Sequence, residues 1–167
     1  VRDINKFSNN VMAQQLFLTL AAQGTSPATP AAARELLTRW AVDRFGEPEA
    51  AFRIDNGSGL SRDTRLTAAS LARLLQGAFD SAVMSELMSS LPASGIDGTL
   101  RRSRAATGRA HLKTGSLRDV AAAAGYVLGA SGRRYVLVAI VQHPNAGAAR
   151  PAIDALVQWT LDDAERR

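Results

Sequence analysis

The residues with the clearest chemical potential lie in the stretch HLKTGSLR at positions 111–118. The chain contains only two lysines, and one of them, Lys113, stands here beside the hydroxyl side chains of Thr114 and Ser116. An ammonium group with neighbouring hydroxyls can bind a carboxylate. Gly115 interrupts an extended pattern, and glycine within a strand often marks the close approach of a ligand. A plain strand end is the structural alternative to such a carboxylate pocket.

A second group of interest is the segment SNN at positions 8–10, which precedes an apolar helical pattern. Taken alone, Ser8 and Asn10 are interpreted as helix-capping residues. If a lysine lies opposite them, a catalytic role becomes possible, because a serine hydroxyl can relay protons and an asparagine amide can hold a substrate carbonyl. The functional hypothesis therefore requires Ser8, Asn10 and Lys113 to meet across a gap that is wide enough for a peptide.

Helical apolar periodicity recurs five times along the chain. Polar caps mark where three of these helices begin: Asn9 or Asn10, then Thr29 followed by Pro30, and Thr67. The expected helices cover residues 10–24, 30–46, 67–79, 81–92 and 150–167. The expected buried faces are formed by Val11, Leu16, Leu18 and Leu20 in the first helix and by Leu36, Leu37, Trp40, Ala41 and Phe45 in the second.

Extended segments dominate the C-terminal half of the chain. AHLKTGSL at 110–117, AAAGYVLGA at 122–130 and RRYVLVAIVQH at 133–143 predict three strands, and a tight turn at 129–132 joins the last two into a hairpin. A short strand is expected at 50–54, and the glycine- and arginine-rich segment after residue 92 is expected to be an irregular loop. Helices followed by an antiparallel sheet and a closing helix indicate an α+β domain.

The bulk composition excludes several classes of function. At 167 residues and 46% apolar content the chain suits one globular domain. Its net charge of +5 is scattered among acidic residues without a basic stripe, which argues against nucleic-acid binding. The chain has no cysteine, and His111 and His143 lack acidic neighbours at ligand spacing, so we expect no metal and no cofactor. No apolar run approaches the roughly 20 residues that span a bilayer.

The ordered pair S-x-N and K-T-G is a signature of the penicillin-recognising serine acyltransferases. The segments INKFSNNVMAQQL, DNGSGLSR, LPASGIDGTL, HLKTGSL and AGYV, taken in order, resemble the D-alanyl-D-alanine carboxypeptidase/endopeptidase family. These enzymes are low-molecular-mass penicillin-binding proteins of the PBP4 (DacB) type, peptidase family S13. The resemblance implies a β-lactamase-like transpeptidase fold, with an antiparallel sheet flanked by helices. It also implies cleavage of peptidoglycan stem peptides through an acyl-serine, reaction with β-lactams, and a periplasmic location in the bacterial cell envelope.

The resemblance also implies roles for individual residues. Ser8 and Lys113 fall on motif positions that assist proton transfer, and Asn10 falls on the position that binds the substrate amide. Thr114 and Ser116 fall where the terminal carboxylate of the substrate is bound, on either side of the motif residue Gly115.

Arg62 follows the polar turn of DNGSGLSR. In this family's arrangement its guanidinium would reach the stem-peptide side chain, whose free carboxylate it suits. An ordinary surface arginine is the alternative. Ser58 and Ser61 in the same segment lack the G-x-S-x-G spacing of a nucleophile elbow, so we interpret them as turn residues.

One motif of the family has no counterpart. S-x-x-K supplies the nucleophilic serine and its lysine base, but Asp3 and Ala110 stand three residues before the two lysines, Lys6 and Lys113. The chain also begins at Val1 rather than at methionine. We therefore expect residues 1–167 to be the C-terminal portion of a transpeptidase-like domain. The nucleophile would come from an upstream segment or a second chain, and the chain alone would be inactive.

Other functions stay open at this point. A binding or scaffold module would keep the carboxylate pocket without turnover. A class A-like β-lactamase is disfavoured because SNN replaces S-D-N and no acidic residue is identifiable as a deacylating base. A sheet that lacks two strands would expose an unpaired edge, which favours association with a second copy of the chain.

Overall fold

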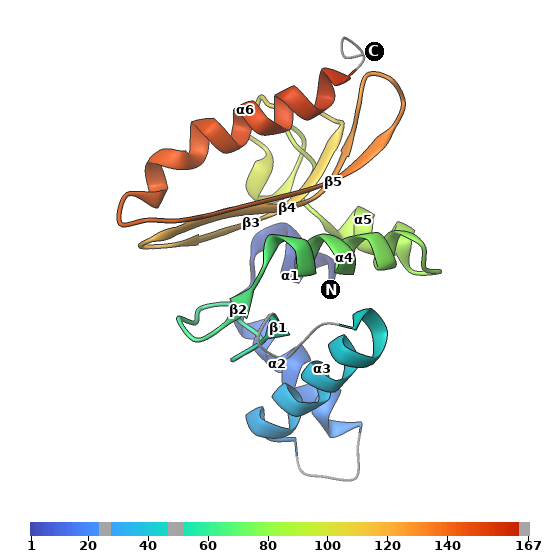
Figure 1. The fold of residues 1–167 in the computed structure, drawn as a ribbon, viewed down its shortest axis with the longest axis vertical. Coiled ribbons are helices and arrows are strands. Elements are labelled where there is room, and N and C mark those ends of the chain that lie inside the picture. Colours follow the sequence, from blue (N-terminus) through green and yellow to red (C-terminus); the bar gives the residue numbers. More distant parts are fainter. Residues whose placement is uncertain (24–27, 47–51, 164–167) are drawn as a thin grey trace.

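The computed structural model describes residues 1–23, 28–46 and 52–163. Its centre is a three-stranded antiparallel sheet in the order β3-β4-β5 (Figure 1). The strands are β3 (Ala110–Leu117), β4 (Val120–Leu128) and β5 (Arg134–Gln142). All three predicted strands are confirmed, with the β4–β5 hairpin where the glycine-containing turn placed it.

Helices cover both faces of this sheet. The C-terminal helix α6 (Arg150–Leu161) packs on one face, and α4 (Ala68–Phe79) packs on the other (Figure 1). Two short helices, α1 (Arg2–Phe7) and α5 (Met84–Ser90), lie on the α4 side and contact each other. A sheet between helical layers confirms the α+β class.

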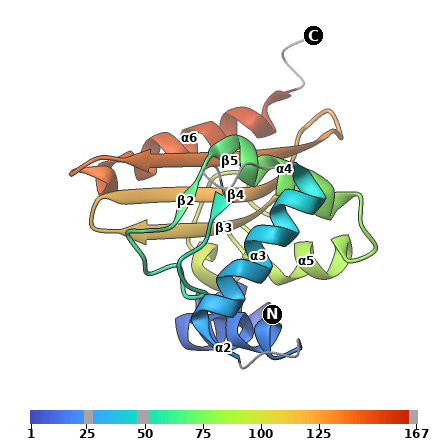
Figure 2. The ribbon, with the colours of Figure 1, turned by 60° about the horizontal axis from the view of Figure 1, so that its bottom comes forward.

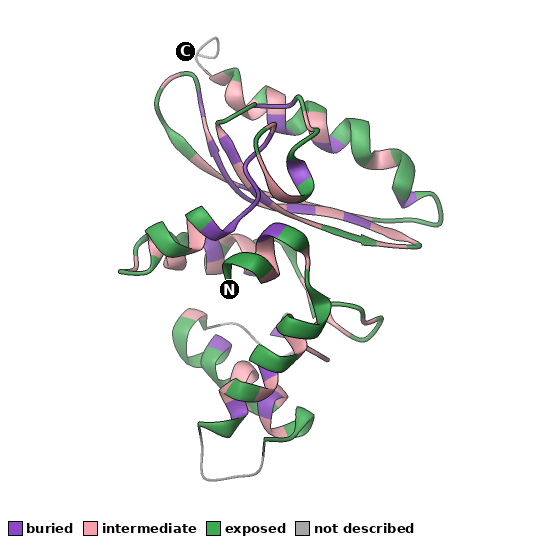
Figure 3. Ribbon diagram, turned by 180° about the vertical axis from the view of Figure 1, so that it is seen from behind, coloured by how far each residue is buried: buried purple, intermediate pink, exposed green. Residues whose placement is uncertain are grey.

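Different side chains fill the two interfaces of the sheet. On the α6 face, Leu112, Val127 and Leu137 pack with Val157 of the helix. On the α4 face, Tyr126 packs with Leu75 and Leu91, and its hydroxyl donates a 2.7 Å hydrogen bond to the carbonyl of Leu75. Figure 3 shows buried residues along the sheet and on the helices that face it. Burial on both sides fixes the register of β3, because a shift by one residue would exchange its two faces.

The remaining helices form a second, smaller packing unit away from the sheet (Figure 1). Helix α2 (Asn10–Ala22) packs against α3 (Pro30–Phe45) through Phe17, Ala21 and Ala33. A two-stranded sheet, β1 (Phe52–Arg53) with β2 (Arg65–Leu66), lies beside them, and η2 (Gly98–Leu100) and η3 (Ala146–Ala149) are single 3₁₀ turns.

The predicted caps are confirmed where the structure describes them. The Thr29 and Thr67 hydroxyls accept hydrogen bonds from the backbone N–H groups of Ala32 and Ser70. Asn9 is the cap of α2, and Gly46 ends α3 in the left-handed conformation. The predicted helix closure at Gly24, the first residues of the strand at 50–54 and the last residues of the closing helix lie outside the described residues.

The buried faces of the two N-terminal helices were predicted only in part. Leu18 and Leu37 pack against the core between α2 and α3, and Ala41 is buried, as expected. Val11 is 73% exposed and Leu16 is also exposed, whereas Phe17 and Ala21 are the buried residues of α2. In α3 Trp40 is exposed, and Ala33 is buried in addition to the predicted Ala41. Phe17 and Ala21 of α2 pack with Ala33 of α3. The side chains of Val11, Leu16 and Trp40 lie outside this contact and are exposed. In the segments that the structure describes, no helix is both long and apolar enough to cross a bilayer.

Candidate active site

Lys113 and Ser8 are brought together from distant parts of the chain. Lys113 lies in β3, and Ser8 follows the last residue of α1. The Nζ of Lys113 donates a 2.5 Å hydrogen bond to Oγ of Ser8 and a 2.8 Å hydrogen bond to the carbonyl of Thr114. The contact with Ser8 spans 105 residues of sequence, so it depends on how α1 packs beneath the sheet.

The backbone at Ser8 is in the left-handed region, with φ 53° and ψ 48°. Among the described residues only Ser8 and Ala106 have positive φ without being glycine. This conformation costs about 1 kcal/mol or more for such a residue and persists where surrounding contacts hold it. At Ser8 it turns the chain from α1 into α2 and leaves the hydroxyl facing Lys113.

Asn9 and Asn10 have different roles at the start of α2. The Oδ1 of Asn9 accepts a 3.0 Å hydrogen bond from the backbone N–H of Met12, which makes Asn9 the cap. Asn10 is the first residue of the helix, and its side chain is exposed. Because capping does not use the Asn10 carboxamide, this group is available to a ligand.

A cleft of about 490 Å³ lies between these residues and β3. Its walls are the end of α1, the start of α2, the loop at 57–60 and the second half of β3. All the predicted site residues except Arg62 line this cleft: Ser8, Asn10, Lys113, Thr114, Gly115 and Ser116.

The second half of β3 presents an open strand edge to the cleft. Figure 2 shows β3 as the outer strand, with β4 on its inner side. The first half of its outer edge is covered, because Leu112 donates to the carbonyl of Pro92 and the carbonyl of Ala110 accepts from Ser94. Backbone groups alternate along an antiparallel strand, so those of Thr114 and Ser116 point to the same edge as those of Leu112. This geometry can accept an extended peptide as an added strand.

The side chains of Lys113 and Thr114 point to different neighbours, as expected for successive residues of a strand. Lys113 faces Ser8, whereas Oγ1 of Thr114 lies 3.3 Å from Oγ1 of Thr99 in η2. An added Cβ at Gly115 would lie 3.6 Å from Cβ of Ala122, which is an ordinary contact. The packing against Ala122 therefore does not require glycine at this position, and Gly115 lines the cleft without a side chain.

Burial lowers the pKa of Lys113 below the ordinary value for lysine. The side chain is half-buried between Ser8 and the sheet, and desolvation disfavours its charged form. Groups whose pKa is shifted by their surroundings gather at functional sites. The lowered pKa and the hydrogen bond to Ser8 together make the amine of Lys113 a candidate for proton transfer.

Arg62 lies outside the cleft, at a neighbouring groove of about 560 Å³ that also contacts Lys113. Its Nη1 donates to both carboxylate oxygens of Asp119, at 2.9 and 2.7 Å. This hydrogen bonding lowers the pKa of Asp119, so the partner is a charged carboxylate. A substrate carboxylate would have to share or replace Asp119 in order to reach Arg62.

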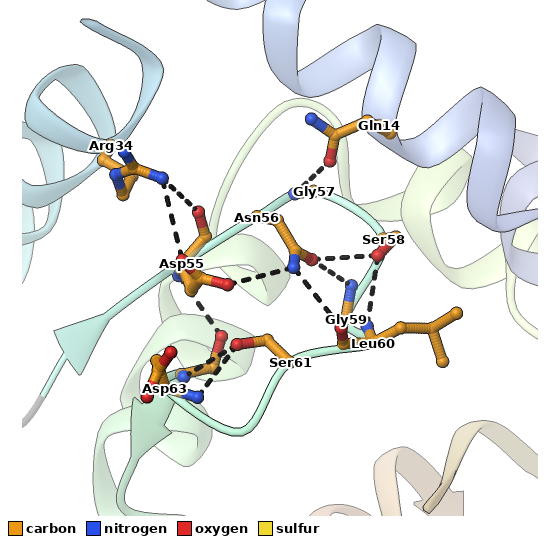
Figure 4. Close-up of polar contacts among 11 residues, drawn as sticks. Gln14, Arg34, Asp55, Asn56, Gly57, Ser58, Gly59, Leu60, Ser61 and Asp63 are labelled. Carbon is orange, nitrogen blue, oxygen red and sulfur yellow. Dashed lines mark hydrogen bonds and ion pairs between the residues drawn. The ribbon is translucent and has the colours of Figure 1, made fainter. Parts of the chain in front are cut away.

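The loop after β1 is held in shape by its own side chains (Figure 4). The Oδ1 of Asn56 accepts hydrogen bonds from the Gly59 N–H and the Ser58 hydroxyl, and Oγ of Ser58 accepts one from the Leu60 N–H. The Ser61 hydroxyl accepts hydrogen bonds from the backbone N–H groups of Asp63 and Thr64. The interpretation of Ser58 and Ser61 as turn residues is confirmed.

The same loop is anchored to α2 through Gly57. Its N–H donates a 2.9 Å hydrogen bond to the side chain of Gln14, as Figure 4 shows. A Cβ at Gly57 would lie 2.3 Å from Cβ of Phe17 and 2.7 Å from the carbonyl of Ala13. Only a residue without a side chain fits here, and this close approach places the loop as one wall of the cleft.

Sequence reasoning missed two residues that contact the predicted set. Thr99 lies within the quoted segment LPASGIDGTL, but nothing in its residue type marks it as a neighbour of Thr114. Asp119 occupies the turn between β3 and β4, where an acidic residue is unremarkable. Both contacts are long-range, and the sequence carries no signal for them.

The sequence comparisons identify relatives with a known class of activity. A sequence model of the D-Ala-D-Ala carboxypeptidase 3 (S13) family matches residues 1–162. A D-alanyl-D-alanine carboxypeptidase of Actinomadura sp. (strain R39) is 33% identical over 93% of this chain and 30% of its own length. Carboxypeptidase DacB of Mycolicibacterium smegmatis is 35% identical over 93% of this chain and 35% of its own length. The chain thus spans about a third of the length of these relatives.

Solved structures share the fold. Penicillin-binding protein 4 (dacB) of Haemophilus influenzae, crystallised with a β-lactam, superposes with a TM-score of 0.70 at 23% identity. The superposition covers 94% of this chain and 40% of that protein. A predatory endopeptidase of Bdellovibrio bacteriovorus, acylated by penicillin G and bound to an immunity protein, superposes with a TM-score of 0.79 at 18% identity. That likeness covers 97% of this chain and 44% of the endopeptidase.

Proposed function

The chain belongs to the D-Ala-D-Ala carboxypeptidase 3 (S13) family, and we propose from this premise that it forms one side of a serine peptidase active site. Its substrates are peptidoglycan stem peptides that end in D-Ala-D-Ala. The single observation that carries the proposal is the hydrogen bond between Lys113 and Ser8 beside Asn10, in a cleft bounded by an open strand edge.

In the proposed reaction a serine hydroxyl adds to the carbonyl carbon of the penultimate D-Ala. Its proton passes, with the help of Ser8 and Lys113, to the nitrogen of the terminal D-Ala. The C–N bond then breaks, the terminal D-Ala leaves, and an ester with the serine remains. Water hydrolyses this ester, which releases the shortened peptide and restores the serine hydroxyl. The depressed pKa of Lys113 supports its part in these transfers.

The residues of β3 bind the substrate in this proposal. The hydroxyls of Thr114 and Ser116 and the amine of Lys113 receive the terminal carboxylate. The open edge of β3 pairs with the peptide backbone, and the Asn10 carboxamide holds the substrate amide. β-lactams would enter as analogues of the same peptide. The β-lactam complex of the H. influenzae relative supports that expectation.

The nucleophile is proposed to come from a further segment of polypeptide or from a second chain. No serine stands three residues before Lys6 or Lys113, so this sequence holds no S-x-x-K. Among the described strands β5 pairs only with β4, which leaves its outer edge able to pair with such a segment. Because peptidoglycan lies outside the cytoplasmic membrane, the proposal places the protein in the cell envelope, in the periplasm where an outer membrane exists.

A binding module without turnover is the second candidate. The absence of S-x-x-K favours it for these 167 residues as they stand. Such a module would recognise D-Ala-D-Ala peptides through the same cleft but form no acyl-enzyme.

Covalent labelling with a fluorescent penicillin separates the two candidates. A longer protein that carries an S-x-x-K segment ahead of this chain should become labelled at that serine. The 167-residue chain alone should remain unlabelled. Labelling of the chain alone at one serine, or no labelling of the longer protein, would overturn the proposal.

A further inference from the structure

We propose that the segment Asp97–Thr99 is a positioning device that sets the distance between Ser8 and Lys113. One residue of this segment holds α1, which leads into Ser8, and another contacts β3, which carries Lys113. The inference rests on the proposed function in taking Ser8 and Lys113 as the groups to be positioned. Its test measures geometry in the chain itself, so it can fail while the family assignment and the penicillin reaction stand.

Lys6 is the link between the segment and α1. It lies two residues before Ser8 and is only 4% exposed. Its Nζ donates to the carbonyl of Leu91 at 2.6 Å and to the two carboxylate oxygens of Asp97 at 2.8 and 2.6 Å. A buried ammonium requires such partners, because an uncompensated charge is expensive to bury. The end of α1 is therefore held at one place, and Lys6 itself does not line the cleft.

Asp97 is held in turn by the backbone. Its Oδ1 accepts a 2.8 Å hydrogen bond from the N–H of Ala93. Burial raises the pKa of Asp97, but the hydrogen bonds from Lys6 and Ala93 outweigh burial, and the pKa lies below its ordinary value. The carboxylate is therefore ionised at neutral pH and pairs with the ammonium of Lys6.

Gly98 brings the segment into direct contact with α1. Its φ is +55°, and an added Cβ would lie 2.6 Å from the carbonyl oxygen of Lys6. A side chain at position 98 would therefore push the end of α1 away, even with every charged group in place.

Thr99 completes the connection to the strand. Its Oγ1 lies 3.3 Å from Oγ1 of Thr114, the residue that follows Lys113. Three consecutive residues thus touch both elements of the site. If the ion pair between Lys6 and Asp97 only stabilised α1, its loss would not change the surroundings of Lys113. The titration of Lys113 therefore distinguishes a structural role from a positioning role.

Lysine NMR provides the measurement, because the two lysines of the chain give two side-chain signals. The titration of Lys113 reports how closely Ser8 and α1 shield its amine. Two variants of the 167-residue chain loosen the segment by different means. Asp97→Asn removes the charge that holds Lys6, and Gly98→Ala inserts a methyl group against the Lys6 carbonyl.

Each variant has a matched control. Glu35→Gln removes a carboxylate from an exposed ion pair with Arg39 on α3. Gly46→Ala carries the same left-handed backbone penalty, with φ +63°, but an added Cβ there meets no atom within 4 Å. Neither control touches α1 or β3.

We expect the pKa of Lys113 to rise toward its ordinary value in Asp97→Asn and Gly98→Ala and to stay unchanged in both controls. A cooperatively folded Asp97→Asn or Gly98→Ala chain with an unchanged Lys113 titration would overturn the inference. If neither variant folds, the test is made on the unmodified chain. Nuclear Overhauser contacts from Thr99 Hβ to Thr114 Hβ and from Gly98 Hα to Lys6 Hα support the inference, and their absence overturns it.

Discussion

The Nζ of Lys113 and the Oγ of Ser8 lie 2.5 Å apart in a cleft that no acidic side chain lines within the described part of the chain. A lysine amine usually finds a carboxylate partner when it is half-buried. Here its partners are a hydroxyl and a backbone carbonyl, and desolvation lowers its pKa. A negatively charged substrate group would therefore enter the cleft without competing with a resident carboxylate.

Replacement of Lys113 tests its chemical role. In a longer protein with an S-x-x-K segment, we expect Lys113→Ala to slow acylation by penicillin by about 10²–10⁴-fold, the usual contribution of a positioned acid–base group. Lys113→Arg should not restore the rate, because guanidinium does not give up its proton. Stopped-flow acylation rates, with circular dichroism to verify folding, provide the measurement. Unchanged rates in a folded Lys113→Ala protein would refute the assigned role.

The pH dependence of the unfolding free energy should reveal the lowered pKa of Lys113. The folded-state pKa of Lys113 is lowered, whereas an unfolded lysine titrates near pH 10.4. Between these values the unfolded chain binds more protons, so the contribution of Lys113 to stability rises with pH. We expect the unfolding free energy of the wild type, minus that of Lys113→Met, to increase from neutral pH to about pH 10.4 and then level off.

Urea unfolding across this pH range measures the difference. Glu35→Gln is the control, because its carboxylate belongs to an exposed surface pair with Arg39, away from Lys113. A Lys113→Met difference that stays flat from pH 7 upward would contradict the lowered pKa.

Gly57→Ala tests the wall of the cleft. The backbone of Gly57 is not in the positive-φ region, so what opposes a methyl group is its clash with Phe17 and with the carbonyl of Ala13. We expect a loss of about 1–3 kcal/mol in unfolding free energy, typical of an overpacked site. Gly147→Ala meets no atom within 4 Å and should change stability by less than about 0.5 kcal/mol. Equal stabilities of the two variants would show that the loop does not depend on this close approach.

Arg62 and Asp119 give a prediction about substrate choice. In the longer protein we expect Arg62→Gln to lower kcat/KM by about 10-fold for stem peptides whose side chain ends in a free carboxylate, equivalent to about 1.4 kcal/mol. Asp119→Asn should raise kcat/KM for the same peptides, because it releases the guanidinium. Peptides with an amidated side chain are the control and should respond weakly to both changes. Loss of activity toward both kinds of peptide to the same extent would assign Arg62 a structural role instead.

Local chemistry accounts for what could be predicted before the structure was known. The cap hydroxyls of Thr29 and Thr67 and the alternating pattern of 110–117 act within a few residues, so the elements that they specify are readable from the sequence. The S-x-N and K-T-G segments also indicate the family, because both occur in this chain in the expected order, and the family model matches residues 1–162.

The amino-acid sequence by itself determined the helices α2 to α6 and the three strands β3 to β5, but it did not indicate the short helix α1. Only the tertiary structure decided that Phe17 rather than Val11 is buried. It also decided that Lys6 at the end of α1 pairs with Asp97, and that Arg62 pairs with Asp119. These contacts join segments that are far apart along the chain. Their geometry follows from helix-on-sheet and helix-on-helix packing, which no local pattern of residues encodes.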